Sequence, residues 1–381
     1  MIDRFEDGFA FLDKLREIGQ RKNQTFADFT VYLDEKARKA GIPLHGQFEL
    51  TPHCNFDCRM CYVHLKPPQA PQSALLSVEQ WKSLMSEAFQ EGMLTAVLTG
   101  GECFTYPGFR DLYLYLKSLG VELTVLTNGS LLDQEWVSFF LEHRPAQIQV
   151  TLYGSSEEAY EAVTGHRLFG KVLENIRLLR DAGLPVRLNV TPSIYMAEDV
   201  FDTIRLAKQL CRSVRVNSSV FRPRQETGRS EQNDNLDQDH YLRMYLLLKE
   251  LDGEEAEKIQ EERLPPPGGP AHECGERGLD CGGGRSGFVI DWKGIMHPCN
   301  RLYMLESFPL TEGFASAFRT INTAVRQWPK VSECSGCAYR FACNNCAANM
   351  LNYAEPGKQP LKLCEQTRFF VQNGIGRVRD C

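Results

Sequence analysis

The chain has 381 residues, of which 43% are hydrophobic and 24% charged, and its net charge is −6. This composition is typical of a globular protein with one large domain and a smaller one. The negative balance argues against nucleic-acid binding, and the sequence contains neither a signal-peptide pattern nor an apolar run long enough to span a membrane. We therefore expect a soluble cytoplasmic protein with no nucleic-acid or membrane partner.

The first part of the chain predicts an α/β fold. Residues 1–44 have a helical pattern of mixed charge that ends near Gly41. From 45 to 235, apolar β-type runs alternate with amphipathic segments, and six β–α units imply a parallel sheet with right-handed crossovers. Strands are expected at 47–51, 95–100, 121–128, 146–154, 185–191 and 213–219. Because six units are too few for a closed eight-stranded barrel, we predict a partial (β/α)6 TIM-like barrel, open on one side.

Two helices within this region have clear end signals. Residues 77–92 begin with Ser77, followed three positions later by Gln80, which is a capping-box pattern. Gly92 and, for the helix at 168–183, Gly183 are expected to end their helices. Beyond the barrel, residues 236–270 predict a bridging helix and the Pro/Gly-rich linker "LPPPGGP", and residues 271–381 a small cysteine-rich domain.

The fourteen cysteines are clustered as metal ligands would be. Without a secretory signal, ligation is a better explanation than disulfides. Cys54, Cys58 and Cys61 lie in "CNFDCRMC", after the first expected strand and therefore at the mouth of the barrel. Three thiolates can hold three irons of a [4Fe–4S] cluster and leave the fourth iron open for a small molecule. A partial zinc site is the alternative.

This loop resembles the cluster motif of radical SAM enzymes. In that family the open iron binds the amino and carboxylate groups of S-adenosylmethionine (SAM), whose reductive cleavage yields a 5′-deoxyadenosyl radical. The resemblance implies that Met60 packs on the adenine and that Tyr62 lies beside it.

A second match follows the second expected strand. Gly100, Gly101 and Glu102 resemble the family's GGE segment, which binds the methionine amino group. Two glycines allow close approach of the backbone, and a carboxylate can pair with an ammonium group. The resemblance also implies that Thr127, Asn128 and Thr151, at the ends of the next two strands, line the SAM site. The alternative for each of them is an ordinary turn residue with no role in ligand binding.

Eight further cysteines between 274 and 364 could form two four-cysteine sites, either two zinc ribbons or two [4Fe–4S] clusters. The segment "GRSGFVIDWKGIMHPC" predicts a hairpin with Lys293 and Gly294 at its turn. The cysteine pattern resembles the SPASM domain, which carries auxiliary clusters in peptide-modifying radical SAM enzymes. The resemblance implies one set of Cys274, Cys281, Cys299 and Cys346 and a second set of Cys334, Cys337, Cys343 and Cys364. The family usually has three residues where Asn344 and Asn345 stand here, and in some members the position of Cys274 is a spare thiol.

The resemblance implies three [4Fe–4S] clusters, SAM as cosubstrate and a peptide, such as a ribosomal precursor, as substrate. The product would contain a thioether or carbon–carbon cross-link, or an epimerised residue. Anaerobic sulfatase-maturating enzymes are the alternative, but they place an aspartate after the cysteine equivalent to Cys299, where this chain has Asn300, and an amide cannot accept the substrate proton. Small-molecule or cofactor biosynthesis also stays open, and a zinc-stabilised scaffold is the alternative from another class.

Cys103 follows the GGE segment directly, where the family commonly has proline. Its thiol could donate a hydrogen atom to a substrate radical, or it could be a small buried core residue. As partners we expect an electron donor such as flavodoxin or ferredoxin. The 44 residues before the barrel are too few for a winged-helix recognition domain, so a separate leader-peptide-binding protein is expected, unless the N-terminal helices and the loop at 222–240 bind the peptide directly.

Overall fold

The computed structural model describes residues 26–65, 70–217, 219–224, 234–263, 278–279, 281–340, 342–343 and 346–376. Residues 1–25 of the expected N-terminal segment, the 264–270 linker, Cys274 and Cys381 lie outside the described residues.

The described strands form one sheet in the order β6-β5-β4-β3-β2-β1-β7-β8. They are β1 (His45–Glu49), β2 (Thr95–Thr99), β3 (Glu122–Thr127), β4 (Gln147–Leu152), β5 (Val186–Val190), β6 (Val214–Val216), β7 (Gly287–Ile290) and β8 (Met296–His297). The six predicted strands are all present, and each of β1 to β5 pairs in parallel with the next strand in sequence. This arrangement confirms the predicted α/β fold with an open parallel sheet.

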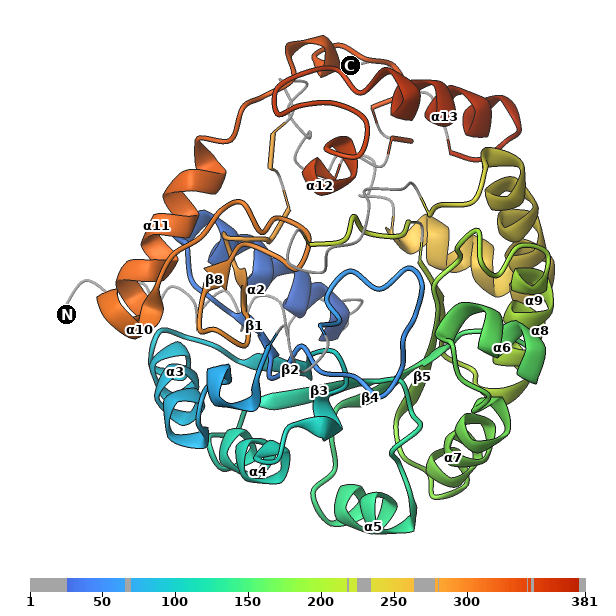
Figure 1. Cartoon of the computed structure of the whole chain (residues 1–381). Coiled ribbons are helices and arrows are strands. Elements are labelled where there is room, and N and C mark those ends of the chain that lie inside the picture. Colours follow the sequence, from blue (N-terminus) through green and yellow to red (C-terminus); the bar gives the residue numbers. More distant parts are fainter. Residues whose placement is uncertain are drawn as a thin grey trace.

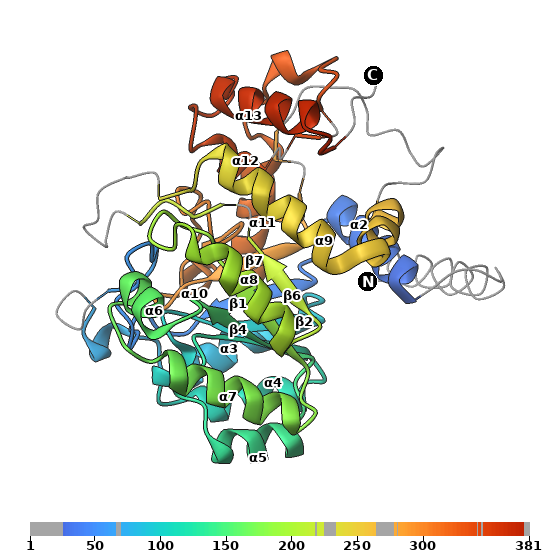
Figure 2. The same ribbon diagram turned by 90° about the vertical axis from the view of Figure 1, so that its right-hand side faces the viewer.

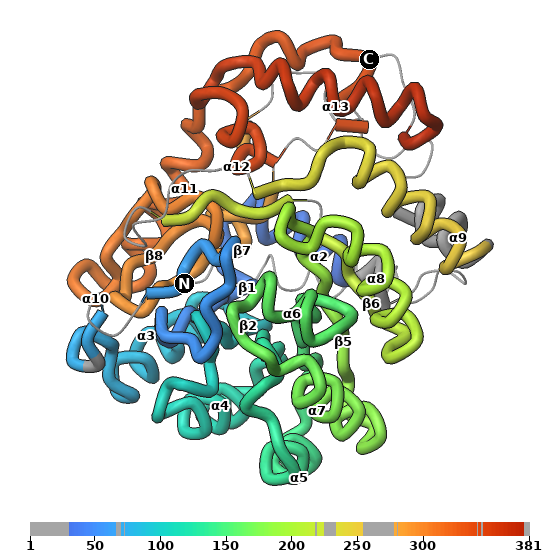
Figure 3. The backbone as a smooth tube through the Cα atoms, turned by 45° about the vertical axis from the view of Figure 1, so that its right-hand side comes forward, coloured from blue at the N-terminus to red at the C-terminus, as the bar shows by residue number. Residues whose placement is uncertain are grey.

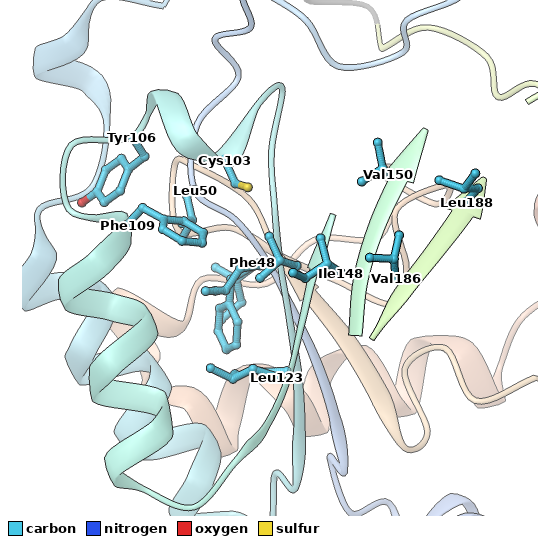
Figure 4. Close-up of a cluster of buried hydrophobic side chains, with 14 of the residues drawn as sticks. Phe48, Leu50, Cys103, Tyr106, Phe109, Leu123, Ile148, Val150, Val186 and Leu188 are labelled. Atoms are coloured by element: carbon cyan, nitrogen blue, oxygen red, sulfur yellow. The ribbon is translucent and has the colours of Figure 1, made fainter. Parts of the chain in front are cut away.

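Helices cover one side of this sheet (Figure 1). They are α3 (Val78–Gln90), α4 (Phe109–Ser118), α5 (Gln134–Glu142), α6 (Glu157–Thr164), α7 (Phe169–Asp181) and α8 (Asp199–Leu210), and α2 (Phe26–Ala40) precedes the first strand. On β4, Ile148 and Val150 are fully buried while Gln149 is partly exposed, because successive side chains of a strand point to opposite faces. Figure 4 shows part of this core, which also contains Phe48 of β1 and Val186 and Leu188 of β5.

The predicted helix ends are present. At the start of α3, the Ser77 backbone N–H donates to Gln80 Oε1 (2.9 Å) and the Gln80 N–H donates to Ser77 Oγ (3.3 Å), which completes the capping box. Gly41, Gly92 and Gly183 follow their helices with φ values of 70°, 114° and 70°, a backbone region that suits glycine.

The predicted hairpin is also present, with β7 and β8 antiparallel and Gly294 in the turn at φ 81°. Its position in the sheet was not predicted. β7 pairs in parallel with β1, from His45 opposite Gly287 to Phe48 opposite Ile290, and so extends the barrel sheet with a strand from the C-terminal region. This pairing covers an edge of β1 that would otherwise expose unpaired backbone groups.

The remaining described elements pack beside the barrel. The α-helices described after the hairpin are α10 (Pro309–Glu312), α11 (Phe314–Arg326), α12 (Ala347–Met350) and α13 (Leu361–Gln372). α9 (Gln238–Arg263), interrupted at Gly253, contacts α8 of the barrel and α13 of the C-terminal part (Figures 2 and 3). Among the described helices, none combines the length and apolar character that crossing a membrane requires.

Candidate active site

The three-cysteine loop follows β1 at the carboxyl ends of the parallel strands. Hydrogen bonds from Asp57 N–H to Thr164 O (3.0 Å) and from Arg59 N–H to Val163 O (2.9 Å) fix the loop against the end of α6. Within the loop, Cys61 N–H donates to Cys58 O (3.0 Å). The fold therefore holds the three cysteines at the mouth of the open barrel, as expected from their place after the first strand.

Hydrogen-bond donors point at the sulfurs of this loop. The Phe56 N–H donates to Cys54 Sγ (3.4 Å), and the His64 N–H donates to Cys61 Sγ (3.3 Å). Tyr153 lies near Cys58 and opposes the rise in the pKa of its thiol. Such donors stabilise the negative charge of a thiolate ligand, so the loop residues fit a bound iron–sulfur cluster.

Burial makes these thiols hard to ionise without a metal. It raises the pKa of the Cys54 thiol to about 12, with a further rise from the nearby Glu102, and it raises the pKa of Cys58 well above its usual range. Thiols in such surroundings give up their protons when a metal supplies compensating positive charge. In the described part of the chain, histidine, cysteine and acidic side chains do not come together in groups of three or more that could bind a single metal ion.

The glycine pair lets the end of β2 lie against the start of the cysteine loop. Gly101 N–H donates to Thr51 O (2.7 Å) and Glu102 N–H donates to His53 O (2.8 Å). A Cβ atom on Gly100 would lie 2.4 Å from Thr51 O, and one on Gly101 would lie 2.3 Å from His53 O. Side chains at these two positions would therefore push the loop away from the strand. In this structure the close approach made by the glycines is to the loop backbone.

Glu102 links the ends of β2 and β3 through hydrogen bonds. Its carboxylate is fully buried and accepts hydrogen bonds from Thr127 Oγ1 (2.8 Å) and from the Asn128 N–H (2.7 Å). Asn128 in turn points its Nδ2 at Cys54 Sγ (3.6 Å) and donates to Asn55 Oδ1 (2.9 Å). The structure thus brings three residues of the predicted SAM site together and links them to the first cysteine.

The remaining predicted ligand-site residues lie elsewhere around the mouth. Met60 is buried in the main core, and Thr151 is partly exposed on β4. Tyr62 packs against Phe221, with ring centroids 5.1 Å apart, and accepts a hydrogen bond from Asn300 Nδ2 (3.4 Å). Tyr62, which follows Cys61, therefore contacts Asn300, which follows Cys299.

Cys103 is fully buried and belongs to the apolar core drawn in Figure 4. Its thiol donates to Leu126 O (3.3 Å) and lies 3.6 Å from Glu102 Oε1, and burial raises its pKa well above the usual value. This environment supports the core-residue alternative over hydrogen-atom donation.

We accordingly expect Cys103→Ala to leave the rate of 5′-deoxyadenosine formation within about twofold of the unchanged protein, with a stability loss of roughly 1 kcal/mol for the small cavity. Mass spectrometry of the nucleoside product and urea unfolding would measure the two effects. A rate loss of tenfold or more in a stably folded variant would return a chemical role to this thiol.

A buried charged cluster at the mouth was missed by the sequence analysis. Glu49, at the end of β1, pairs with Arg224 Nη2 (2.5 Å) and accepts from the Tyr303 hydroxyl (2.8 Å). Arg224 also hydrogen-bonds to Tyr303, lies over its ring, and donates its backbone N–H to Tyr62 O (3.0 Å). The cluster ties the barrel and the cysteine loop to the segment after Cys299. No local pattern in the sequence marks Glu49 and Arg224, which are 175 residues apart.

The protonation of Glu49 should make stability depend on pH. Burial raises its pKa from 4.5 to about 7, an effect that Arg224 opposes. The folded protein then keeps a proton that the unfolded chain loses, so the free energy of unfolding falls as pH rises from about 4.5 to 7. Between pH 5 and pH 8 this group contributes a decrease of up to ~3 kcal/mol.

We expect Glu49→Gln to remove this decrease, because glutamine does not titrate. Urea unfolding at pH 5 and pH 8 would give the change in the free energy of unfolding for the wild type and for the variant. The matched control is Glu135→Gln, because Glu135 is exposed and pairs with Arg110. An unchanged pH dependence in Glu49→Gln would contradict the assignment.

Some of the described C-terminal cysteines lie near other members of the set expected for them. Burial raises the pKa of Cys299 to about 11, although the N–H groups of Arg301 and Leu302 oppose this rise. Cys281 and Cys346 lie near enough to raise the pKa of Cys299 further. Burial also raises the pKa of Cys364, with contributions from the neighbouring Cys343 and Cys337. Cys334 and Cys343 pack on one small apolar cluster with Val331, Met350 and Leu363.

The chain is an open β/α barrel with a three-cysteine loop after its first strand. This arrangement suits a metal cluster at the mouth of the barrel. Residues 48–215 match the model of the radical SAM superfamily. The match spans β1 to β6, less than half of the chain, and agrees with the resemblance seen in the sequence of this region.

Two curated relatives match part of the chain. The antilisterial bacteriocin subtilosin biosynthesis protein AlbA of Bacillus subtilis is 32% identical over 149 residues, which cover 39% of this chain and 33% of AlbA. The AdoMet-dependent heme synthase of Methanosarcina barkeri is 28% identical over 216 residues, which cover 56% of this chain and 59% of that protein. The chain thus spans less than two thirds of either relative.

Among solved structures, Streptococcus suis SuiB bound to S-adenosylmethionine superposes with a TM-score of 0.64 at 15% identity, covering 95% of this chain and 88% of SuiB. SuiB bound to its precursor peptide SuiA gives a TM-score of 0.57 at 15% identity, covering 94% of this chain and 89% of that one. These likenesses show that the fold is shared along nearly the whole chain.

Proposed function

We propose that this protein is an enzyme that reductively cleaves SAM and modifies a peptide. The observation that carries the proposal is the loop of Cys54, Cys58 and Cys61, held at the mouth of the barrel with N–H donors aimed at its sulfurs. A [4Fe–4S] cluster bound there supplies the electron that splits the sulfonium of SAM and so provides a 5′-deoxyadenosyl radical. The chain's own residues hold the loop, through Glu102 and Asn128 on one side and the end of α6 on the other.

A peptide substrate is supported by the relatives. AlbA is a bacteriocin biosynthesis protein, and SuiB binds a precursor peptide. Formation of a thioether or carbon–carbon cross-link, or epimerisation, is proposed for this chain on that ground. The sulfatase-maturating alternative is less well supported, because Asn300 lies where that class needs a proton acceptor and its amide donates to Tyr62.

A second candidate is the modification of a small molecule. It is favoured by the match to the heme synthase, which covers more of this chain than the match to AlbA does. The two candidates share the same cleavage of SAM and differ in the molecule from which hydrogen is abstracted.

We further propose that the C-terminal cysteines hold two auxiliary [4Fe–4S] clusters, one on Cys281, Cys299 and Cys346 together with Cys274, the other on Cys334, Cys337, Cys343 and Cys364. The proximity of the described members of each set supports this grouping. An electron donor of the flavodoxin or ferredoxin type, a separate leader-peptide-binding protein and a cytoplasmic location belong to the same proposal.

Co-expression would test the peptide assignment. Each short peptide encoded beside the gene would be produced with the wild-type chain or with Cys58→Ala, and its mass would be measured. We expect one peptide to lose hydrogen or become cross-linked only with the wild-type chain. SAM cleavage by the purified protein with no change in the mass or in the residue stereochemistry of any of these peptides would favour the small-molecule candidate.

A further inference from the structure

Arg301 lies against an aromatic ring close to the cysteine loop of the barrel. Its guanidinium is 3.8 Å from the ring centroid of Phe221, and its Nη1 donates to Asn349 Oδ1 (2.9 Å). Phe221 in turn packs against Tyr62, which directly follows the last cysteine of the loop. Because Arg301 is two residues beyond Cys299, it joins that C-terminal segment to the mouth of the barrel.

Other arginines of this protein show what completes such an arrangement. At three further places in the described part of the chain, a guanidinium lies 4.4 Å or less from the centroid of an aromatic ring, and each of these arginines also pairs with a carboxylate. The ring attracts the face of the guanidinium, and the carboxylate accepts hydrogen bonds at its edge. The three sets are Arg110, Trp136 and Glu135; Arg243, Phe201 and Glu198; and Arg224, Tyr303 and Glu49.

Arg301 has the ring but not the carboxylate. Among the described residues, its side chain interacts with Phe221 and Asn349, and neither of these carries a negative charge. Arg301 is only partly exposed, and a cation that is partly withdrawn from water is unfavourable without an opposite charge. A carboxylate of another molecule would complete the set in the way that Glu198 does for Arg243.

Asn349 fixes the guanidinium and adds a second donor. It is 6% exposed on α12, and its Oδ1 accepts from Ser219 Oγ (3.1 Å) as well as from Arg301 Nη1. Because a guanidinium group only donates hydrogen bonds, the amide oxygen must face Arg301. The Nδ2 group has no acceptor among the described residues, so it remains available beside Arg301 to donate to an anion.

We propose that Arg301, together with Phe221 and Asn349, binds a carboxylate group of the molecule that this protein modifies. The inference rests on the proposed function, because the carboxylate must belong to that substrate. In a peptide, the group is either an acidic side chain or the C-terminus. Since Phe221 contacts Tyr62, a carboxylate bound here would hold the substrate beside the cysteine loop.

Isothermal titration calorimetry under anaerobic conditions would test this on the reconstituted full chain with SAM bound. The probes are acetyl-Ala-Glu-Ala-amide for a side-chain carboxylate, acetyl-Ala-Ala-Ala for a C-terminal carboxylate, and acetyl-Ala-Gln-Ala-amide as the neutral analogue. We expect one of the two carboxylate probes to bind about tenfold more tightly than the neutral analogue, the effect of a hydrogen-bonded charge pair. The tighter of the two carboxylate probes identifies the source of the group.

Four variants make the result specific. Arg301→Met should reduce the preference for a carboxylate to about twofold or less, and Asn349→Asp should do the same because it gives Arg301 a carboxylate of the chain's own. Arg301→Lys keeps the charge but not the forked N–H groups, so it should keep about a third of the preference. Arg243→Met is the matched control, because Glu198 already pairs with that arginine, and it should leave the affinities of all three probes unchanged.

Equal affinities of the wild type for the charged and neutral probes would overturn the inference. So would a preference that persists in Arg301→Met or, if that variant does not fold, in Asn349→Asp. An affinity for SAM that falls about tenfold in Arg301→Met would also overturn it, because the arginine would then bind the carboxylate of SAM. The proposed function is judged separately, by 5′-deoxyadenosine formation, so a protein that cleaves SAM but does not distinguish the probes loses only this inference.

Discussion

Cys58→Ala is expected to abolish the cleavage of SAM. Cys58 is the middle cysteine of the barrel loop and lies within electrostatic reach of Cys54 and Cys61. Removing even an outer partner of a metal ligand typically costs ~10–100-fold in metal affinity or activity, so loss of a ligand itself should exceed 100-fold. The measurement is 5′-deoxyadenosine released from SAM by the dithionite-reduced, reconstituted protein.

Cys211→Ala is the matched control. Cys211 follows α8, and its thiol donates to Val186 O (3.1 Å), away from the cysteine groups in sequence. This variant should keep wild-type iron and activity. A Cys58→Ala protein that still cleaves SAM at a tenth of the wild-type rate or more would remove the loop from the proposed function.

At pH 8, where Glu49 is ionised, Arg224→Met is expected to lower the free energy of unfolding by about 3–5 kcal/mol, the effect of leaving one member of a buried ion pair without its partner. Glu49 is 1% exposed and Arg224 8% exposed, and Tyr303 completes the cluster. Because Arg224 also donates its backbone N–H to Tyr62 O, and Tyr62 bonds with Asn300, a loosened cluster should loosen the contact between the two cysteine segments. Urea unfolding would give the stability, and hydrogen exchange of peptides covering 54–65 and 299–305 would show the local loosening.

Arg243→Met provides the comparison at the surface. Arg243 pairs with Glu198 (2.8 Å) and lies over Phe201 (4.2 Å), but its side chain is 53% exposed. Exposed pairs contribute ~1 kcal/mol or less, so this variant should be nearly as stable as the wild type. Equal losses in Arg224→Met and Arg243→Met would show that the buried cluster has no special structural role.

The barrel could be predicted from the sequence because its signals are local. Each strand is a short apolar run next to an amphipathic segment, and the helix ends at Ser77, Gly92 and Gly183 use residues with defined capping chemistry. The cysteine loop and the GGE segment are also short, so their positions at the ends of successive strands followed from the same pattern.

The features that were missed depend on long-range pairing. Nothing near Gly287 indicates that its strand would pair with β1, because any exposed parallel edge offers the same backbone groups. Glu49 and Arg224 come from segments 175 residues apart, and no local pattern indicates that they pair. The inward turn of the Glu102 carboxylate likewise depends on β3, whose Thr127 and Asn128 supply the donors.

The most direct test of the central claim is one assay on the anaerobically reconstituted wild-type chain. SAM and dithionite would be added, 5′-deoxyadenosine would be quantified by mass spectrometry, and iron would be counted on the same sample. The account predicts 5′-deoxyadenosine formation together with about twelve irons per chain, four for each of three clusters. Zinc in place of iron, with SAM left intact, would contradict this account and would show that the cysteines bind a structural metal.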